Sequence, residues 1–301
     1  MSRNNDDRLT PQTGAAQDAS TETPTAATQA TGPANSGSPF QFVAPTEFVE
    51  LPSRGDFYPE GHVLNGVETV EIRQMTAKDE DILTSRALLK KGVALDKMIT
   101  NLLVDKRINP VDMLIGDKNA ILVAARSSGY GSDYTTKITC PHCTENSEAT
   151  FDLNEVSITE PPDGLAGVTR EGPYYNIELP QSKVIARVKL LTGKDEQLMS
   201  RNSRINKKAG MGNQTTLTSQ MRSFIVAVNG DSTPKNIAYF VDHMPARDSR
   251  FLRTIYKAIT PNVDMTQSFE CEHCGYTSEL EVPFTTCLLY TSDAADERLS
   301  V

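Results

Sequence analysis

Apolar and polar positions along this chain follow two periods, and each period predicts a different kind of element. Alternation of apolar and polar residues predicts β-strands at 48–52, 67–72, 133–139, 147–153, 175–179 and 184–191. A 3.6-residue apolar spacing predicts α-helices at 76–91, 93–103, 117–129, 217–228, 234–242 and 248–260, with another opening at 192–196. Strands and helices are therefore mixed along the chain, and we expect an α+β fold with a largely helical body.

Capping residues sharpen several of these boundaries. Thr76 precedes Asp79 and Glu80, so the first helix has an N-cap and acidic residues in its first turn, where they suit the helix dipole. Gly92 follows two lysines and is typical of a helix end. Pro234 fits the first position of a short helix. These signals place the ends of the predicted helices at capping residues.

Two cysteine pairs far apart in the sequence carry the clearest chemical signal. One is Cys140-Pro141-His142-Cys143 and the other is Cys271-Glu272-His273-Cys274, each flanked by strand-like residues. Gly275 follows the second pair and suits a tight turn. Two such turns, here called knuckles, supply the four thiolates of a closed tetrahedral zinc site. The sequence therefore predicts a structural Zn²⁺ held by Cys140, Cys143, Cys271 and Cys274.

Other interpretations of the cysteines remain open at this stage. Two disulfides would also account for four cysteines, although no segment resembles a secretory signal and a reducing cytosol favours a metal. A thioredoxin-like redox pair would explain one motif and leave the other without a role. His142 and His273 occupy matching positions inside the knuckles and could be ligands, but the paired sulfurs already point at one metal, so we expect them to be bystanders.

The two halves of the body resemble each other. Residues 75–83 align with 191–199, and Asp117 and Asp248 each open a helix 23 residues before the first cysteine of a knuckle. We therefore expect pseudo-repeats at about 67–155 and 173–284, joined by one shared zinc-ribbon-like site that neither half can complete alone. Chance similarity between common helix starts is the alternative.

The composition of the two chain ends limits the expected domain to the residues between them. Residues 1–40 are rich in Thr, Ala, Ser, Gln, Gly and Pro, and we expect a disordered tail. Residues 287–301, which include Cys287, look like a translated library adapter, so we expect an artefact there and a single zinc-stapled domain at 41–286. Since no apolar run approaches a membrane span, we expect a soluble, intracellular protein with no membrane partner.

Charge and aromatic content weigh against a nucleic-acid-binding protein. The net charge is -9, Trp is absent and aromatic residues make up 6% of the chain. A basic segment at 201–212 is expected to be a solvated loop rather than a contact surface. If a zinc-ribbon nucleic-acid-binding protein were the right class, its contacts would be Lys194, Arg201, Arg204, Lys207 and Lys208.

No catalytic constellation is visible in the sequence. It contains no phosphate-binding loop, nucleophile elbow or zinc-protease helix motif. Four thiolates would close the metal's coordination shell, whereas a catalytic zinc keeps a position open. Asp242, His243 and Asp248 lie close together in sequence, but a helix-to-helix turn accounts for them. We therefore do not expect an enzyme.

Three stretches of the body resemble a known family. They are 48–59 (Phe-Val-Glu-Leu-Pro-Ser-Arg-Gly-Asp-Phe-Tyr-Pro), 72–83 (Ile-Arg-Gln-Met-Thr-Ala-Lys-Asp-Glu-Asp-Ile-Leu) and 116–122 (Gly-Asp-Lys-Asn-Ala-Ile-Leu). Together they are similar to the baseplate proteins of T-even-type contractile-tailed bacteriophages over about residues 45–286. The adapter-like end departs from the family's pattern. In the first stretch, Arg54 and the Phe57-Tyr58-Pro59 cluster could form a partner-binding surface or, by the simpler interpretation, a structural loop.

The resemblance implies a non-enzymatic role in building the central hub of the tail baseplate, as an assembly factor (a chaperone) or as a minor structural component. It implies other phage baseplate and hub proteins as partners. It also implies a location in the host cytoplasm during assembly or in the tail baseplate of the virion.

Overall fold

The computed structural model of the chain describes residues 44–282, apart from 163 and 209–216. Residues 1–43 and 44–301 form separate units, and only the second contains described residues. The predictions made for the tail at 1–40, for the segment 287–301 and for Cys287 lie outside the described residues.

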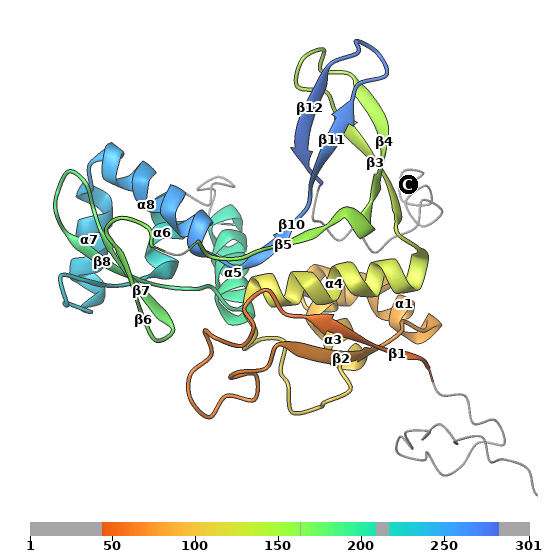
Figure 1. Cartoon of the computed structure of the whole chain (residues 1–301), viewed down its shortest axis with the longest axis horizontal. Helices are drawn as coiled ribbons and strands as arrows, with labels where there is room; N and C mark the ends of the chain where they lie inside the picture. Colours follow the sequence, from red (N-terminus) through yellow and green to blue (C-terminus); the bar gives the residue numbers. More distant parts are fainter. Residues whose placement is uncertain (1–43, 163, 209–216, 283–301) are drawn as a thin grey trace, which may run out of the picture. The chain divides into compact units, whose positions relative to one another are not determined.

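The first part of the described chain is a β-hairpin followed by helices (Figure 1). Its elements are β1 (Thr46–Glu50), β2 (Thr69–Arg73), α1 (Ala77–Thr84), α2 (Arg86–Lys91), α3 (Ala94–Leu102) and α4 (Ile115–Tyr130). Strand β1 pairs antiparallel with β2, with Val49 opposite Val70, so both valines face the core. The strands and helices predicted over this region are therefore present, with shifts of one to a few residues at their ends.

One predicted helix is interrupted. The pattern over 76–91 predicts a single helix, but Ser85 adopts an extended conformation and divides it into α1 and α2. The predicted ends are confirmed: Thr76 and Asp79 form a capping box, and the Gly92 N–H bonds to the Leu88 and Leu89 carbonyls with a φ of 73°. The interruption leaves α2 with no buried residue, so apolar packing does not extend the first helix past the break.

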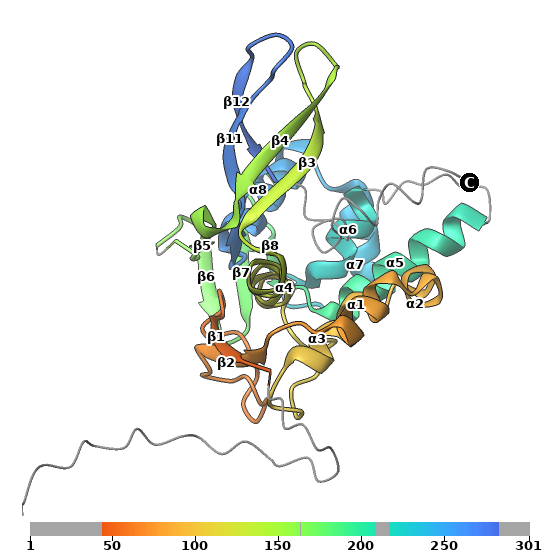
Figure 2. The same ribbon diagram turned by 90° about the vertical axis from the view of Figure 1, so that its right-hand side faces the viewer.

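Two further hairpins lie side by side, on the side of α4 away from the β1–β2 hairpin (Figures 1 and 2). Their elements are β3 (Asp133–Thr139), β4 (Asn146–Asp152), β11 (Thr266–Glu270) and β12 (Thr277–Glu281). A short antiparallel pair at their base joins β5 (Ser157–Thr159) to β10 (Asn262–Asp264), after the 3₁₀ turn Leu153–Glu155. Segments more than a hundred residues apart in the sequence therefore meet twice, at the β5–β10 pair and at the paired hairpins.

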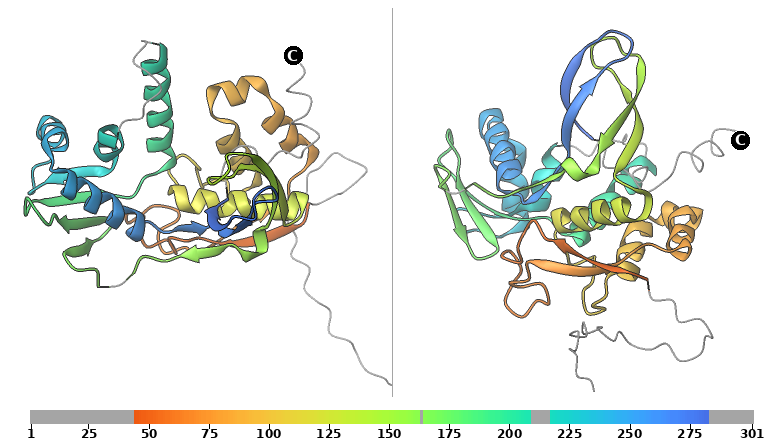
Figure 3. Two further views of the ribbon diagram at one scale, coloured as in Figure 1. Left: turned by 90° about the horizontal axis from the view of Figure 1, so that it is seen from above. Right: turned by 45° about the vertical axis from the view of Figure 1, so that its right-hand side comes forward.

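The remaining elements build a four-stranded antiparallel sheet with helices around it. The strand order is β6 (Val168–Glu171), β7 (Tyr174–Glu178), β8 (Ile185–Lys189), β9 (Ile225–Val228), and the helices are α5 (Gly193–Lys208), α6 (Leu217–Phe224), α7 (Pro234–His243) and α8 (Ala246–Ile259). Figure 3 shows α5 and the α1–α3 group projecting to the same side of the molecule.

Two predictions in this region are wrong in part. The basic segment predicted as a loop at 201–212 is helical up to Lys208, where Lys and Arg are good helix formers behind a capped start. The helix predicted over 217–228 ends at Phe224, because the β-branched run from Ile225 pairs with β8 and alternates between buried and half-buried positions. Strand β6 was not predicted from the sequence.

Most apolar burial lies in the helical body rather than in the paired hairpins. One cluster runs from β1 to α8 and includes the fully buried Ile72, Leu102 and Leu252. The bases of the hairpins share a smaller cluster that includes Phe151 and Met265, and their tips share Cys140, Phe269 and Cys271. No helix in the described ranges is long and apolar enough to cross a membrane.

Candidate metal centre

Each cysteine pair sits at the turn of a hairpin, and the two turns make the same backbone contacts. The Cys140 N–H bonds to the Glu145 carbonyl at 2.8 Å, and the Thr144 N–H bonds back to the Cys140 carbonyl at 2.9 Å. In the other turn, the Cys271 N–H bonds to the Tyr276 carbonyl and the Gly275 N–H bonds to the Cys271 carbonyl, both at 2.9 Å.

Residue five of each turn adopts a left-handed conformation. Thr144 has a φ of 62° and Gly275 a φ of 65°. Glycine adopts this region without strain, whereas a β-branched threonine is strained there. Since both turns keep the same conformation despite that strain, the geometry that directs the two cysteines of each turn to one point is common to both hairpins.

The four sulfur atoms converge between the two hairpins. All four Sγ atoms lie within 4.8 Å of one another. The shortest separations run across the hairpins, 3.8 Å between Cys140 and Cys274 and 3.7 Å between Cys143 and Cys271. A tetrahedral zinc with Zn–S bonds of about 2.3 Å holds its sulfurs about 3.8 Å apart. The four cysteines are thus close enough to hold a metal ion, and the donor set fits zinc.

The same distances argue against the disulfide interpretation. All four cysteines are free thiols in this structure. A disulfide bond is about 2.05 Å long, so sulfurs 3.7 Å apart are in contact without being bonded. The shortest contacts also join one turn to the other, which a redox site confined to one Cys-x-x-Cys pair does not explain.

The protein surrounds the sulfurs with hydrogen-bond donors and apolar groups. Cys140 and Cys271 are buried, and Phe269 packs against both. The Ser147 hydroxyl lies 3.3 Å from the Cys271 sulfur, and the His142 N–H donates to the Cys140 sulfur at 3.4 Å. The hydrogen bond from Ser147 is the main cause that lowers the pKa of Cys271 to about 6. A backbone hydrogen bond would lower the pKa of Cys274, but burial and the neighbouring sulfurs outweigh it and raise that pKa. Without a metal, the thiolate is therefore favoured at Cys271 and disfavoured at Cys274. Ser147 was not singled out from the sequence.

Neither histidine of the knuckles belongs to the sulfur group. The His142 ring stacks on Tyr276 with centroids 5.5 Å apart. The His273 Nε2 atom lies 3.3 Å from the Asn146 carbonyl oxygen. Within the described residues, the group that could hold a metal here consists of the four cysteines.

Below the sulfurs, one glutamine joins the hairpins directly. Gln267 on β11 accepts a hydrogen bond from the Asp152 N–H at 3.1 Å and donates to the Asp152 carbonyl at 2.7 Å. It is 9% exposed, so the paired bonds replace water for a buried amide. The strand pattern alone gave no reason to select Gln267.

The other groups considered for chemistry have structural partners. Asp242 pairs with Arg222, the His243 ring stacks on Tyr239, and Asp248 accepts hydrogen bonds from two backbone N–H groups at 2.8 and 2.9 Å. These three side chains therefore do not converge on a common point. The simple helix-to-helix turn accounts for their closeness in sequence.

The aromatic cluster after β1 forms a structural loop. Phe57 and Tyr58 are 6% and 5% exposed, whereas Arg54 is exposed and pairs with Glu160. The Tyr58 and Ser53 hydroxyls both donate to buried Asp117 at 2.6 Å. Burial is the main cause that raises the pKa of Asp117, opposed by these hydrogen bonds. The sequence identified Asp117 as a helix start but not as the anchor of this loop.

Of the five basic residues considered for nucleic-acid binding, the structure describes the side chains of two. Lys194 and Arg201 lie on α5, and both line a groove between α5 and the end of α2. The side chains of Arg204, Lys207 and Lys208 lie outside the described residues.

Comparison with protein-family models shows to which family the chain belongs. The family model described as T4 bacteriophage base plate protein matches residues 46–285. The chain therefore belongs to the T4 bacteriophage base plate protein family, and the resemblance found in the sequence is confirmed. Comparison with curated proteins and with solved structures gives no match.

Proposed function

We propose that this phage baseplate protein takes part, without catalysis, in assembly of the baseplate hub, as an assembly factor or as a minor structural component. The observation that carries the proposal is the family match over residues 46–285, which takes in nearly the whole described chain. A donor set of four thiolates supports the non-catalytic part, because it would leave a bound zinc no open position for substrate.

The proposal includes one structural Zn²⁺ at Cys140, Cys143, Cys271 and Cys274. The sulfur separations and the hydrogen bond from Ser147 to Cys271 support it. Bound zinc would supply four metal–sulfur bonds between the tips of two hairpins, where the other shared contact is a small buried cluster. The ion would therefore act as a staple between distant parts of the chain.

The proposal also includes a pseudo-repeat, at about 67–155 and 173–284. Paired contacts 116 residues apart support it. Asp79 accepts from the Thr76 N–H and hydroxyl at 2.9 and 2.8 Å, and Asp195 accepts from the same groups of Thr192 at 3.1 and 2.9 Å.

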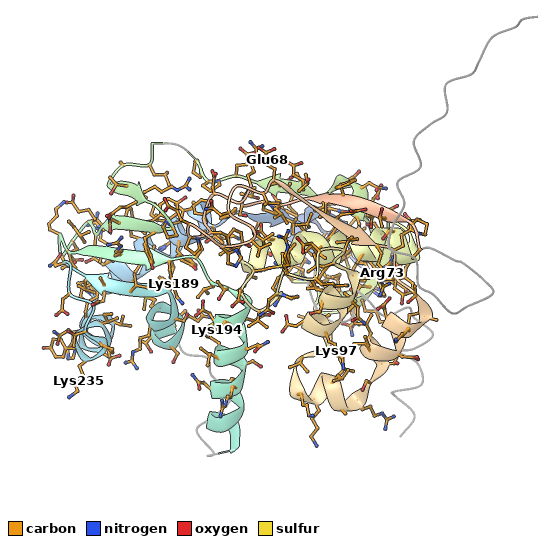
Figure 4. The ribbon with its side chains drawn as sticks, turned by 90° about the horizontal axis from the view of Figure 1, so that it is seen from below. Glu68, Arg73, Lys97, Lys189, Lys194 and Lys235 are labelled. Carbon is orange, nitrogen blue, oxygen red and sulfur yellow. The ribbon has the colours of Figure 1, made fainter. Side chains whose placement is uncertain are left out.

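A basic residue on the preceding strand completes each of these two sites. Arg73 bonds Asp79 at 2.7 Å, and Lys189 bonds Asp195 at 2.6 Å. Figure 4 labels Arg73 at the start of the α1–α3 group and Lys189 near α5. Each carboxylate thus fixes a helix start to the strand before it.

A second pair of matched contacts links the loops to later helices. Leu51-Pro52 follows β1 and Leu179-Pro180 follows β7, and the next residue in each case donates its N–H to a helix carboxylate. The Ser53 N–H bonds Asp117 at 3.0 Å, and the Gln181 N–H bonds Asp248 at 2.8 Å. These matched contacts favour a duplicated unit over chance similarity between helix starts.

Other proteins of the tail baseplate are the proposed partners, met in the host cytoplasm during assembly or in the virion. The net charge of -9 supports a protein partner over nucleic acid, because phosphate binding depends on a strong positive field. We further infer that residues 41–286 act as one domain.

A co-purification tests the hub role. The chain would be co-expressed with the tail proteins encoded beside it, in zinc-containing medium, and washed at high salt. We expect one hub protein to remain bound in a fixed stoichiometric ratio. A variant with Cys143→Ser and Cys274→Ser serves as the control for dependence on the staple.

The alternative outcomes are distinct. Recovery of nucleic acid alone, with a steep loss as salt rises, would favour a zinc-ribbon nucleic-acid-binding protein instead. Recovery of no tail protein would contradict the hub role while leaving the family membership unchanged.

A further inference from the structure

Helix α8 carries a cationic face whose basic residues form no close ion pair in the described part of the chain. Four of its basic residues share one side of the helix, with Thr254 among them: Arg247, Arg250, Arg253 and Lys257. Arg247, Arg250, Thr254 and Lys257 are exposed, and Arg253 is half-buried. Within the described ranges, none of the four makes an ion pair with a carboxylate at 4.0 Å or less.

The opposite side of α8 is fixed in the core, which leaves the cationic face outward. Leu252 and Ile259 are buried, and Phe251 and Ile255 pack against the same core. The helix therefore cannot rotate to hide its cations. In a chain of net charge -9, four unpaired cations in a row are unusual enough to need an explanation.

A groove of about 960 Å³ runs along this face, between α8 and the start of the β11–β12 hairpin. Figure 1 shows α8 leading into β10, from which that hairpin rises. Arg250, Arg253 and Lys257 form one wall, and apolar parts of Val263 and Met265 contribute to the lining.

The other wall has the opposite charge. Asp264 and Glu281 are exposed and line the groove across from α8. A phosphate backbone is charged along its whole length and would meet these carboxylates, whereas an extended polypeptide can direct its acidic side chains to α8 alone and its other side chains to the opposite wall. Tyr256 also lines the groove, but its ring already stacks on Phe224 with centroids 4.0 Å apart, so it offers no face to a base. The charge arrangement fits a polypeptide better than a nucleic acid.

We propose that the α8 groove binds an acidic segment of another polypeptide, whose carboxylates pair with Arg250, Arg253 and Lys257 and whose apolar side chains lie on the half-buried Val263. The inference rests on the proposed function in one respect, that the partner is another tail protein. Several cations in one row give a network, which holds a partner better than an isolated exposed ion pair. Binding weakens as salt screens the charges.

Photo-crosslinking on the full chain tests the groove. A photoreactive phenylalanine analogue replaces Thr254, which lies between Arg250 and Lys257 on the same face. The chain is expressed together with the tail proteins, irradiated, and the linked peptide is sequenced by mass spectrometry. We expect the link to fall in a tail-protein segment rich in Asp and Glu.

Charge reversal then tests the ion pairs. Arg250→Glu with Lys257→Glu should reduce the crosslink yield at least tenfold while the chain stays folded, because both side chains are exposed. Lys97→Glu with Lys235→Glu is the matched control, with the same charge change at exposed positions of α3 and α7, outside the groove (Figure 4). It should leave the yield within twofold of the parent. Replacing the carboxylates of the linked segment by lysines should restore binding to the reversed chain.

Each other result contradicts the proposal. A link to nucleic acid, a link to a segment without carboxylates, or an equal loss in both charge variants would overturn it. If a tail protein co-purifies and no link forms at Thr254, the groove is not its docking site although the hub role stands. If no tail protein co-purifies at all, the hub role itself fails.

Discussion

The paired hairpins and the helical body hold their chains in place by different means. The body has a continuous apolar cluster that extends from β1 to α8. The hairpin tips share a cluster of three buried residues, two of which are metal-site cysteines. Two-stranded hairpins alone are marginally stable in water. The body is stabilised by a continuous apolar core, whereas the hairpins share a small cluster at their bases and few buried residues at their tips, so we expect a bound metal to contribute most of the stability of the tips.

Metal removal should produce the largest difference in stability between the paired hairpins and the body. Structural zinc in small peptides contributes on the order of 10 kcal/mol or more. After chelation, or in a Cys143→Ser, Cys274→Ser variant, we expect amides of β3, β4, β11 and β12 to exchange rapidly with deuterium. Amides of α4 should stay protected. Equal loss of protection in both regions would show that the metal supports the whole fold.

A core truncation should produce the reverse pattern. Leu102 is fully buried in the body cluster, so Leu102→Ala should lower the free energy of unfolding by about 2–5 kcal/mol. Bound zinc per chain should not change. The control is Leu198→Ala, at a leucine 48% exposed on α5, whose effect should lie within about 0.5 kcal/mol. Zinc loss in the Leu102 variant would remove the distinction between the regions.

Loss of the glutamine bridge should weaken the hairpins alone. Gln267→Ala leaves the buried backbone N–H and carbonyl of Asp152 without their partner, at a cost of about 1–3 kcal/mol. We expect faster deuterium exchange in β4 and β11 and an easier release of zinc to a chelator. Ser268→Ala, at the exposed neighbouring position, is the control and should change neither the deuterium exchange nor the zinc release.

Of these changes, a lower pH should destabilise the body least. Burial alone would raise the pKa of Asp79, but hydrogen bonds from Arg73 and Thr76 outweigh it and lower the pKa to about 2. The pKa of Asp195 is also lowered, since bonds from Lys189 and Thr192 outweigh its burial. A lowered carboxylate pKa stabilises the fold above the unfolded value, and that contribution is lost as pH falls from about 4 towards 2.

The hairpins should respond to acid earlier, because protons compete with zinc for the thiolates. We therefore expect zinc release and hairpin exchange to begin at a pH where α1 and α5 remain protected. Asp79→Asn should flatten the acid response of the body between about pH 4 and 2. A single acid transition shared by the hairpins and the body would contradict this order.

Several features were predictable because they depend on local rules. The four cysteines were found from motif spacing, and Thr76 and Gly92 from the chemistry of helix ends. Strand alternation located β1, β2, β7 and β8 within a few residues. These signals use neighbours in sequence, so no tertiary contact was needed to detect them.

Other features depend on distant partners and were missed. The pairing of β9 with β8 overrides a helical pattern, and β5 becomes a strand only beside β10, about a hundred residues later. Gln267 and Ser147 look like ordinary polar strand residues until their partners, Asp152 and Cys271, are in place. Buried polar contacts between segments leave little trace in the periodicity of either segment.

Thiol reactivity combined with intact-protein mass spectrometry tests the central claim most directly. The full chain has five cysteines, of which Cys274 is exposed in the described structure. Under native conditions we predict one zinc per chain and no alkylation of Cys140, Cys143, Cys271 or Cys274, because zinc-bound thiolates react poorly. Chelation should release the zinc and make these four thiols reactive. Alkylation of Cys274 in the untreated, zinc-free protein would contradict the four-thiolate site.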